Sequence, residues 1–209
     1  MTYQICVKTH GKLLREMVIE ELKDNAINAA LKAGEYLLHE KNSKKKVFLE
    51  KGRDIKLEID RNAEKIIRDY LETTDIQILG EEFGGELKPD CMTWVIDPLD
   101  GTSNYFRGLD QCCVSIGLIK NEEPIVGVIN DFNNGNLYVS SLGGGSYLNN
   151  KRIHVSNIKD KNKATIGTGF PTGSEFSNTI NFLQTLGEWK KIRMIGSAAM
   201  SSAFVAAGK

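Results

Sequence analysis

The chain has few of the residues on which several common kinds of site depend. It has only four cysteines in 209 residues and contains no Cys-x-x-Cys pair, and its three histidines lie far apart. This argues against structural zinc and against a histidine-based site, so carboxylates must hold any metal. We expect free thiols at Cys6, Cys91, Cys112 and Cys113, in a reducing cytoplasm. The adjacent Cys112 and Cys113 should point to opposite faces of a strand.

The chain also lacks an excess of either charge. Lys and Arg together number 27, as do Asp and Glu, so the formal net charge is zero. Nothing in this balance favours nucleic acid or an anionic membrane as a partner. No apolar run approaches the roughly 18 residues of a membrane span, and residues 1–15 have no signal-peptide core. We therefore expect a cytoplasmic protein with no nucleic-acid or membrane partner.

Apolar periodicity predicts four helices and seven short strands. The helices are expected at 13–40, 60–71, 174–186 (with Ser174 as N-cap) and 197–207. The strands are expected at 76–79, 93–96, 113–119, 125–129, 137–140, 164–168 and 191–195. Residues 41–52 are basic and are expected to form a mobile segment. Gly143 to Gly145 predict a hairpin turn, since no helix-forming segment or Gly-Lys-Ser/Thr ending follows, as a phosphate loop requires.

The order of these elements predicts an α/β protein with two lobes. Short strands separated by tight turns are typical of an antiparallel meander, which we assign to an N-terminal α+β lobe at 1–155. Strands and helices alternate after that point, which indicates a partial C-terminal α/β lobe at 156–209. The chain stops at Lys209, where another strand is expected, so we expect the second lobe to be incomplete.

The most specific pattern is a pair of aspartates at the end of a short apolar strand. Asp97 and Asp100 lie three residues apart with Pro98 between them, and Gly101 and Thr102 follow. Carboxylates held by such a turn can converge on a hard cation such as magnesium, and the threonine hydroxyl can orient a water molecule. This pattern points to metal-assisted phosphate chemistry. The alternative is that these acids only cap turns of a globular protein.

Further acidic residues stand at the ends of other predicted elements. Glu81 and Glu82 follow the strand at 76–79, and Asp60 begins the helix at 60–71. With these upstream acids, the stretch from Asp97 to Tyr105 resembles the first signature of the inositol monophosphatase family, which are magnesium-dependent, lithium-sensitive phosphatases. Later stretches that resemble family landmarks are 143–149, Gly169-Phe170-Pro171 and Gly196-Ser197-Ala198-Ala199.

The resemblance implies a role for each matching residue. The residues that resemble metal ligands are Glu81, Asp97, the backbone carbonyl of Leu99, and Asp100. Those that resemble the catalytic group are Asp60, Thr102 and Glu81, with Asp60 and Thr102 orienting the attacking water. Those that resemble substrate-binding positions are Asp100, Gly101, Thr102 and Ala198. Glu82 has a structural role in this assignment.

The resemblance also implies a layered αβαβα sandwich, two or three magnesium ions, and a possible homodimer. The expected activity is hydrolysis of inositol monophosphate or a similar small polyol phosphate by metal-activated water. Two enzymatic alternatives stay open, a phosphatase of 3′-phosphoadenosine 5′-phosphate and one of fructose 1,6-bisphosphate. A third is a truncated, inactive family member, because the chain ends before the family's second signature, Trp-Asp-x-Ala-Ala-Gly.

Overall fold

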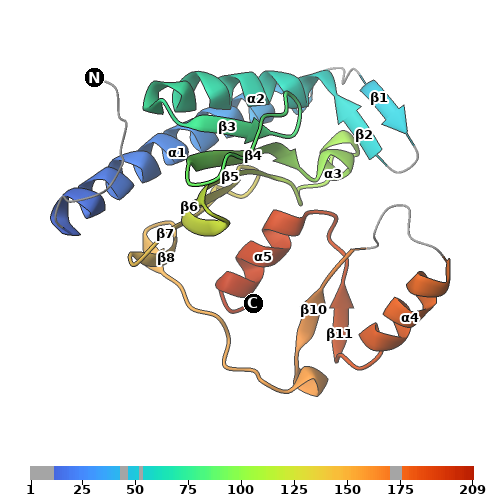
Figure 1. Cartoon of the computed structure of the whole chain (residues 1–209). Helices are drawn as coiled ribbons and strands as arrows, with labels where there is room; N and C mark the ends of the chain where they lie inside the picture. The colour runs from blue at the N-terminus through green and yellow to red at the C-terminus, as the bar shows by residue number, and fades with distance from the viewer. Residues whose placement is uncertain (1–11, 43–46, 52–53, 170–175) are drawn as a thin grey trace.

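The computed structural model of the chain describes residues 12–42, 47–51, 54–169 and 176–209. It consists of one large sheet with helices on both faces, and a smaller α/β part beside it (Figure 1). The helices are α1 (Lys12–Glu40), α2 (Glu58–Leu71), α3 (Thr102–Phe106), α4 (Phe176–Leu186) and α5 (Ala198–Ala206), with short 3₁₀ turns at Glu72–Thr74 and Lys161–Lys163. No helix in these ranges is sufficiently long and apolar to cross a membrane.

The large sheet has seven strands in the order β3-β4-β5-β6-β7-β8-β9. They are β3 (Gln77–Gly80), β4 (Met92–Asp100), β5 (Cys113–Lys120), β6 (Glu123–Asp131), β7 (Asn136–Ser141), β8 (Gly145–Leu148) and β9 (Lys151–Arg152). The pair β3 and β4 is parallel, and every later neighbour pairs antiparallel. The predicted meander is therefore confirmed, and it extends over six strands.

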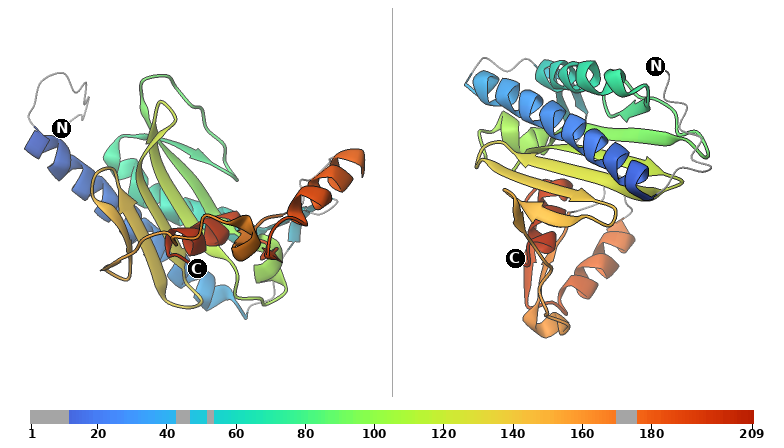
Figure 2. Two further views of the ribbon diagram at one scale, coloured as in Figure 1. Left: turned by 90° about the horizontal axis from the view of Figure 1, so that it is seen from below. Right: turned by 90° about the vertical axis from the view of Figure 1, so that its left-hand side faces the viewer.

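The main hydrophobic core lies between this sheet and the pair α1 and α2. Small residues let α1 approach the strands closely: Ala26, Ala29, Ala30 and Ala33 are fully buried there. The face of β4 that packs against these helices contributes Trp94, Ile96 and Leu99, all in the same core cluster. The opposite face of the sheet is covered by α5, as the two views in Figure 2 show.

Strand β4 contains a bulge at the acidic motif. Asp97 pairs with Ser115 of β5, and Asp100 pairs with Cys113, so β4 has one residue more than β5 between these two pairs. Residues three apart normally face opposite sides of a sheet, but an extra residue restores them to the same side. The bulge therefore keeps Leu99 in the core and leaves both aspartates on the side away from α1 and α2.

The smaller part is built on a second, two-stranded sheet. Its strands β10 (Thr165–Gly167) and β11 (Lys191–Arg193) pair in parallel, with α4 as the crossover between them. The chain then returns to the large sheet through α5, where Met200 and Ala203 are buried. On α3, the side chain of Asn104 donates a hydrogen bond of 2.7 Å to the carbonyl of Ile195 just before α5. This bond ties α3 to the start of α5.

Most predicted elements are confirmed, and the elements that were not expected are short strands and the short helix α3. The segment expected to be mobile contains β1 (Val47–Lys51), which pairs antiparallel with β2 (Asp54–Leu57), and its mobility stays a prediction. Strands β8 and β9 were not expected. The strand expected at 93–96 continues to Asp100, because the acidic motif is a bulge within it and not a turn after it. The expected N-cap Ser174 lies outside the described residues.

Candidate active site

The parallel pairing of β3 and β4 brings two of the predicted metal ligands together. Gly80 at the end of β3 lies opposite Ile96 of β4. The next residues along these strands are Glu81 and Asp97, so their side chains leave neighbouring strands at the same edge of the sheet. The negative charge of Glu81 is among the causes that raise the pKa of Asp97, so the fold brings these two distant stretches close together.

The environment of Asp97 strongly favours its protonated form. Burial is the largest cause, followed by the negative charges of Glu81 and Asp100, and together they raise the pKa of Asp97 to about 8. The N–H of Leu99 donates a hydrogen bond of 3.1 Å to Asp97 Oδ1, which acts in the opposite direction but is weaker. A cation in this position would remove the electrostatic cost of ionising the carboxyl group.

The carboxylate of Asp100 is held by the first residues of α5. Its Oδ2 accepts hydrogen bonds of 2.6 Å from both the Ser197 hydroxyl and the Ala199 N–H, and its Oδ1 accepts one of 3.3 Å from the Ala198 N–H. The predicted substrate-binding residue Ala198 therefore meets the predicted ligand Asp100. Carboxylates are favoured at helix N-termini, where unpaired N–H groups point outward.

The two adjacent cysteines lie on opposite sides of the sheet, as predicted. The thiol of Cys113 faces the acidic cluster, with its Sγ 4.0 Å from Asp100 Oδ2, and burial and that charge raise the pKa of the Cys113 thiol. Cys112 belongs to the core cluster on the other side, where its Sγ accepts a hydrogen bond of 3.2 Å from Asn133. Cys91, Cys112 and Cys113 are free thiols, and Cys6 lies outside the described residues.

The residues after the bulge are fixed by their backbone. Gly101 has a φ of 98°, and a Cβ there would lie 2.8 Å from the carbonyl oxygen of Gln111, so only glycine fits without strain. Thr102 begins α3 and donates a hydrogen bond of 3.0 Å from its hydroxyl to the carbonyl of Leu99. Its oxygen lone pairs therefore remain available to accept a hydrogen bond.

Asp60 lies in the first turn of α2 and is 2% exposed. Burial is the main cause that raises the pKa of Tyr105, and Asp60 is among the negative charges that raise it further. This interaction places Asp60 on the side of the Tyr105 side chain, whose hydroxyl donates a hydrogen bond to the carbonyl of Leu37 on α1. The hydrogen bond expected from Thr102 to Asp60 stays a prediction, since the Thr102 hydroxyl donates to Leu99.

Sequence reasoning missed a buried ion pair behind the Glu81 loop. Glu64 is fully buried, and the Arg68 Nε donates a hydrogen bond of 2.9 Å to it. Glu64 also accepts a hydrogen bond of 2.7 Å from the backbone N–H of Glu82. The backbone of Glu82 thus has a structural contact, and the role of its side chain stays a prediction. The available signal was an acid and a base four residues apart on α2, with the acid lying among apolar residues that face the core.

The acidic donors fit a hard cation, although they do not yet surround one. In the described part of the chain, no three His, Cys, Asp or Glu side chains are arranged closely enough to hold one ion as they stand. Both oxygens of Asp100 instead accept hydrogen bonds from α5. The donor set of Glu81, Asp97, Asp100 and the Leu99 carbonyl is nevertheless all oxygen, which suits magnesium and does not suit softer metals.

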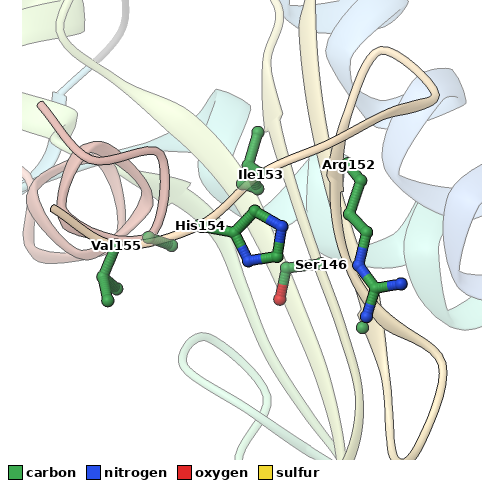
Figure 3. A pocket seen from close by; sticks show the side chains of 7 residues that line it. Ser146, Arg152, Ile153, His154 and Val155 are labelled. Atoms are coloured by element: carbon green, nitrogen blue, oxygen red, sulfur yellow. The ribbon is translucent and has the colours of Figure 1, made fainter. Parts of the chain in front are cut away.

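A separate pocket of about 280 Å³ lies at the far end of α5, next to Ala206 (Figure 3). It is also lined by Ser146, Arg152, His154 and three apolar or glycine residues of the segment from β8 to Val155. Helix α5 has nine residues and is therefore roughly 12 Å long, so the pocket is well separated from Asp100 at its start. It contains no predicted site residue.

The fold and this cluster define a class of protein. The sheet and its helices place carboxylates at a bulge beside a helix N-terminus, and this set of oxygen donors is typical of metal-dependent enzymes that act on anions. The model of the inositol monophosphatase family matches residues 18–209, nearly the whole chain. The chain belongs to this family, whose members are metal-dependent hydrolases.

The chain is similar to proteins from several bacteria. It is 41% identical over 191 residues to the Nus factor SuhB of Xylella fastidiosa, covering 88% of this chain and 69% of that protein. It is 36% identical over 187 residues to a fructose-1,6-bisphosphatase/inositol-1-monophosphatase of Aquifex aeolicus, covering 86% and 71%.

Solved structures agree with this family assignment. The extragenic suppressor protein suhB of Bartonella henselae matches with a TM-score of 0.81 and 31% identity, covering 88% of this chain and 74% of that one. The inositol monophosphatase of Anabaena matches with a TM-score of 0.78 and 31% identity, covering 91% and 72%. The mixed sheet flanked by helices is therefore the fold of this family, as predicted.

Proposed function

We propose that the chain hydrolyses inositol monophosphate or a similar small polyol phosphate, with magnesium bound at the acidic cluster. The observation that carries this proposal is the meeting of Glu81, Asp97 and Asp100 at one edge of the sheet, from two stretches of sequence. Family membership supports the same activity. The substrate class is supported by relatives whose names include inositol-1-monophosphatase activity.

Each residue of the cluster has a distinct part in this proposal. Glu81, Asp97, Asp100 and the Leu99 carbonyl would hold two or three magnesium ions, which supply an activated water and neutralise the phosphate. Asp100 Oδ1 accepts one hydrogen bond from α5, so its remaining lone pair is open to an ion, and turning the carboxylate toward that ion would lengthen its bond to the Ala198 N–H. Asp97 must lose the proton that its surroundings favour.

The residues after the bulge would act on water and substrate. Thr102 would accept a hydrogen bond from the attacking water through its lone pairs, and Asp60 would orient that threonine once the hydroxyl proton turns from the Leu99 carbonyl to Asp60. The backbone N–H groups of Gly101 and Thr102 would meet the phosphate. When Asp100 turns toward the metal, the N–H of Ala198 becomes available to a substrate hydroxyl.

A second candidate substrate is fructose 1,6-bisphosphate. It is favoured by the similarity to the Aquifex aeolicus protein, whose name joins both activities. Comparing kcat/KM for inositol 1-phosphate, fructose 1,6-bisphosphate and 3′-phosphoadenosine 5′-phosphate would rank the three substrates directly.

The experiment that tests the proposal is release of inorganic phosphate from inositol 1-phosphate over a magnesium series. Asp97→Ala should reduce kcat/KM by more than the roughly 10–100-fold typical of residues behind a metal ligand. Glu86→Ala is the matched control, because Glu86 is an exposed acid on the loop that follows β3. Folded protein that releases no phosphate from any of the three substrates at any magnesium concentration would contradict the proposal.

Three further expectations belong with this function. Lithium should inhibit the reaction, and light scattering should show a homodimer. The division into lobes at 1–155 and 156–209 is also proposed, with the acidic cluster on the first lobe and Ala198 supplied by the second.

A further inference from the structure

The buried carboxylate of Glu64 lies behind the loop that carries Glu81. It is 0% exposed, and its ion pair with Arg68 spans one turn of α2. Removing a charge from water is costly unless other groups compensate it. The groups that offset the cost of burying the Glu64 charge therefore indicate which part of the fold this carboxylate holds in place.

Besides its ion pair with Arg68, Glu64 accepts hydrogen bonds from two backbone N–H groups. Its Oε2 accepts a hydrogen bond of 2.7 Å from the N–H of Glu82, and its Oε1 accepts one of 3.3 Å from the N–H of Phe83. These are the two residues directly after Glu81. The contacts hold the backbone at 82 and 83 against α2, and the negative charge of the preceding residue, Glu81, acts on Asp97.

Arg68 holds the other end of the same loop. Its Nη2 donates a hydrogen bond of 2.8 Å to the carbonyl of Gly84. That carbonyl also accepts a hydrogen bond of 3.1 Å from the N–H of Gly80, which closes residues 80–84 into a ring. The loop at 80–84 is therefore fixed by Glu64 at its middle and by Arg68 at its end.

Gly80 shows how closely the carboxylate approaches this loop. A Cβ built on Gly80 would lie 2.0 Å from Glu64 Oε1 and 2.5 Å from its Cδ. No side chain can occupy that space while Glu64 keeps its contacts. The glycine before Glu81 is thus required by the buried carboxylate and not by its own backbone angle, which is not positive.

We infer that Glu64 and Arg68 are positioning residues for the proposed metal site, which fix the loop at 80–84 so that Glu81 is presented to the ion bound beside Asp97. The inference rests on the proposed function. A loop released from these contacts would have to be ordered at each binding event, and this entropy cost lowers the affinity for the ion.

The decisive variant is Glu64→Gln, which keeps the size of the side chain but removes its charge and one of its two acceptor oxygens. Calorimetry with magnesium alone, without substrate, should show the dissociation constant rise by about 10-fold or more. Amide hydrogen exchange at Glu82 and Phe83 should become faster. At saturating magnesium, kcat should change by less than about threefold, because the groups that touch substrate are intact.

Two more variants make the result specific. Arg68→Lys keeps a positive charge beside Glu64, but a single ammonium cannot reproduce the contacts of the planar guanidinium with both Glu64 and Gly84. Arg68→Lys should also raise the magnesium dissociation constant, and it should disturb folding less than Glu64→Gln does. Asp69→Asn is the matched control, since it makes the same acid-to-amide change at an exposed position on α2. It should leave the dissociation constant unchanged.

The outcomes separate the two proposals. If the wild-type chain binds no magnesium, the proposed function fails and the positioning role fails with it. If the wild type binds magnesium and folded Glu64→Gln and Arg68→Lys bind it equally tightly, the positioning role is overturned and the proposed function stands. A lower melting temperature with an unchanged magnesium dissociation constant would likewise show that the ion pair serves stability alone.

Discussion

At the scale of single residues, Asp97 couples protonation to folding. Its pKa is raised to about 8, whereas an aspartate in the unfolded chain ionises near pH 4. Between these values the folded protein holds a proton that the unfolded chain has released. The contribution of Asp97 to the free energy of unfolding therefore falls as the pH rises from about 4 to about 8. A cation would replace the same proton, so magnesium affinity should rise over the same range.

Asp97→Asn removes this dependence, because an amide does not ionise. In a chelating buffer, the melting temperature of the wild type should fall more between pH 5 and pH 8 than that of the variant. For a chain of this length, about 1 kcal/mol corresponds to a shift of roughly 2–4 °C, which calorimetry resolves. The Leu99 N–H can still donate to an asparagine oxygen, so other contacts are preserved. Parallel pH profiles for the two proteins would contradict the raised pKa.

Two glycines offer a matched test of the backbone after the bulge. Gly101 and Gly108 both have positive φ, at 98° and 76°, but only a Cβ at Gly101 would meet other atoms. Gly108→Ala should cost about 1 kcal/mol of unfolding free energy for the backbone angle alone. Gly101→Ala should cost more, by a further 1–3 kcal/mol or so, because the Gln111 carbonyl must also move. Equal costs in chemical denaturation would show that the contact at Gly101 relaxes freely.

At the scale of elements, the start of α5 depends on Ser197. Its hydroxyl accepts a hydrogen bond of 3.2 Å from the Met200 N–H as an N-cap and donates one of 2.6 Å to Asp100. Ser197→Ala should therefore reduce stability by about 1–2 kcal/mol. Ser202→Ala is the control, because that exposed hydroxyl only donates to a carbonyl within α5. A urea titration in which both variants match the wild type would exclude the capping role.

The elements predicted well from sequence are those with a strong local signal. The stripe Ala26, Ala30, Ala33 and Leu37 predicts α1 because spacing by three and four places those residues on one face. Helix α5 was predicted for a similarly local reason, its closely spaced small residues. Strands β1, β8 and β9 have between two and five residues each, too few to establish a period, and pairing with a neighbour decides their structure.

The site shows the same division between local and long-range signals. Asp97, Asp100 and Thr102 stand in one short motif, so their chemistry is readable from the sequence. The loop contacts of Glu64 were missed because these partners lie 18 and 19 residues away, and the local pair with Arg68 carries no information about them. The bulge was also missed, since an extra residue in a strand is defined only by the strand beside it.

At the scale of the whole molecule, the large and small sheets are joined by an exposed connection. The large sheet ends with β9 at Arg152 and the small one begins with β10 at Thr165, and all residues from His154 to Lys163 are exposed. Helix α5 lies beyond β10 and β11 in sequence but packs under the large sheet. Cleavage of the connection would therefore leave the two pieces held together through α5.

Limited trypsin digestion tests this arrangement and the proposed boundary near residue 155. Lys159 is an exposed site within the connection, so early cleavage should yield a large fragment ending there and a smaller C-terminal one on a denaturing gel. In native gel filtration the nicked protein should still elute as one species, because Met200 and Ala203 remain buried and Asp100 still holds the start of α5. Adding Ser197→Ala should promote separation of the fragments. If the wild-type fragments separate at once, the contacts of α5 do not join the lobes. If the connection resists trypsin, the chain behaves as a single cooperative unit.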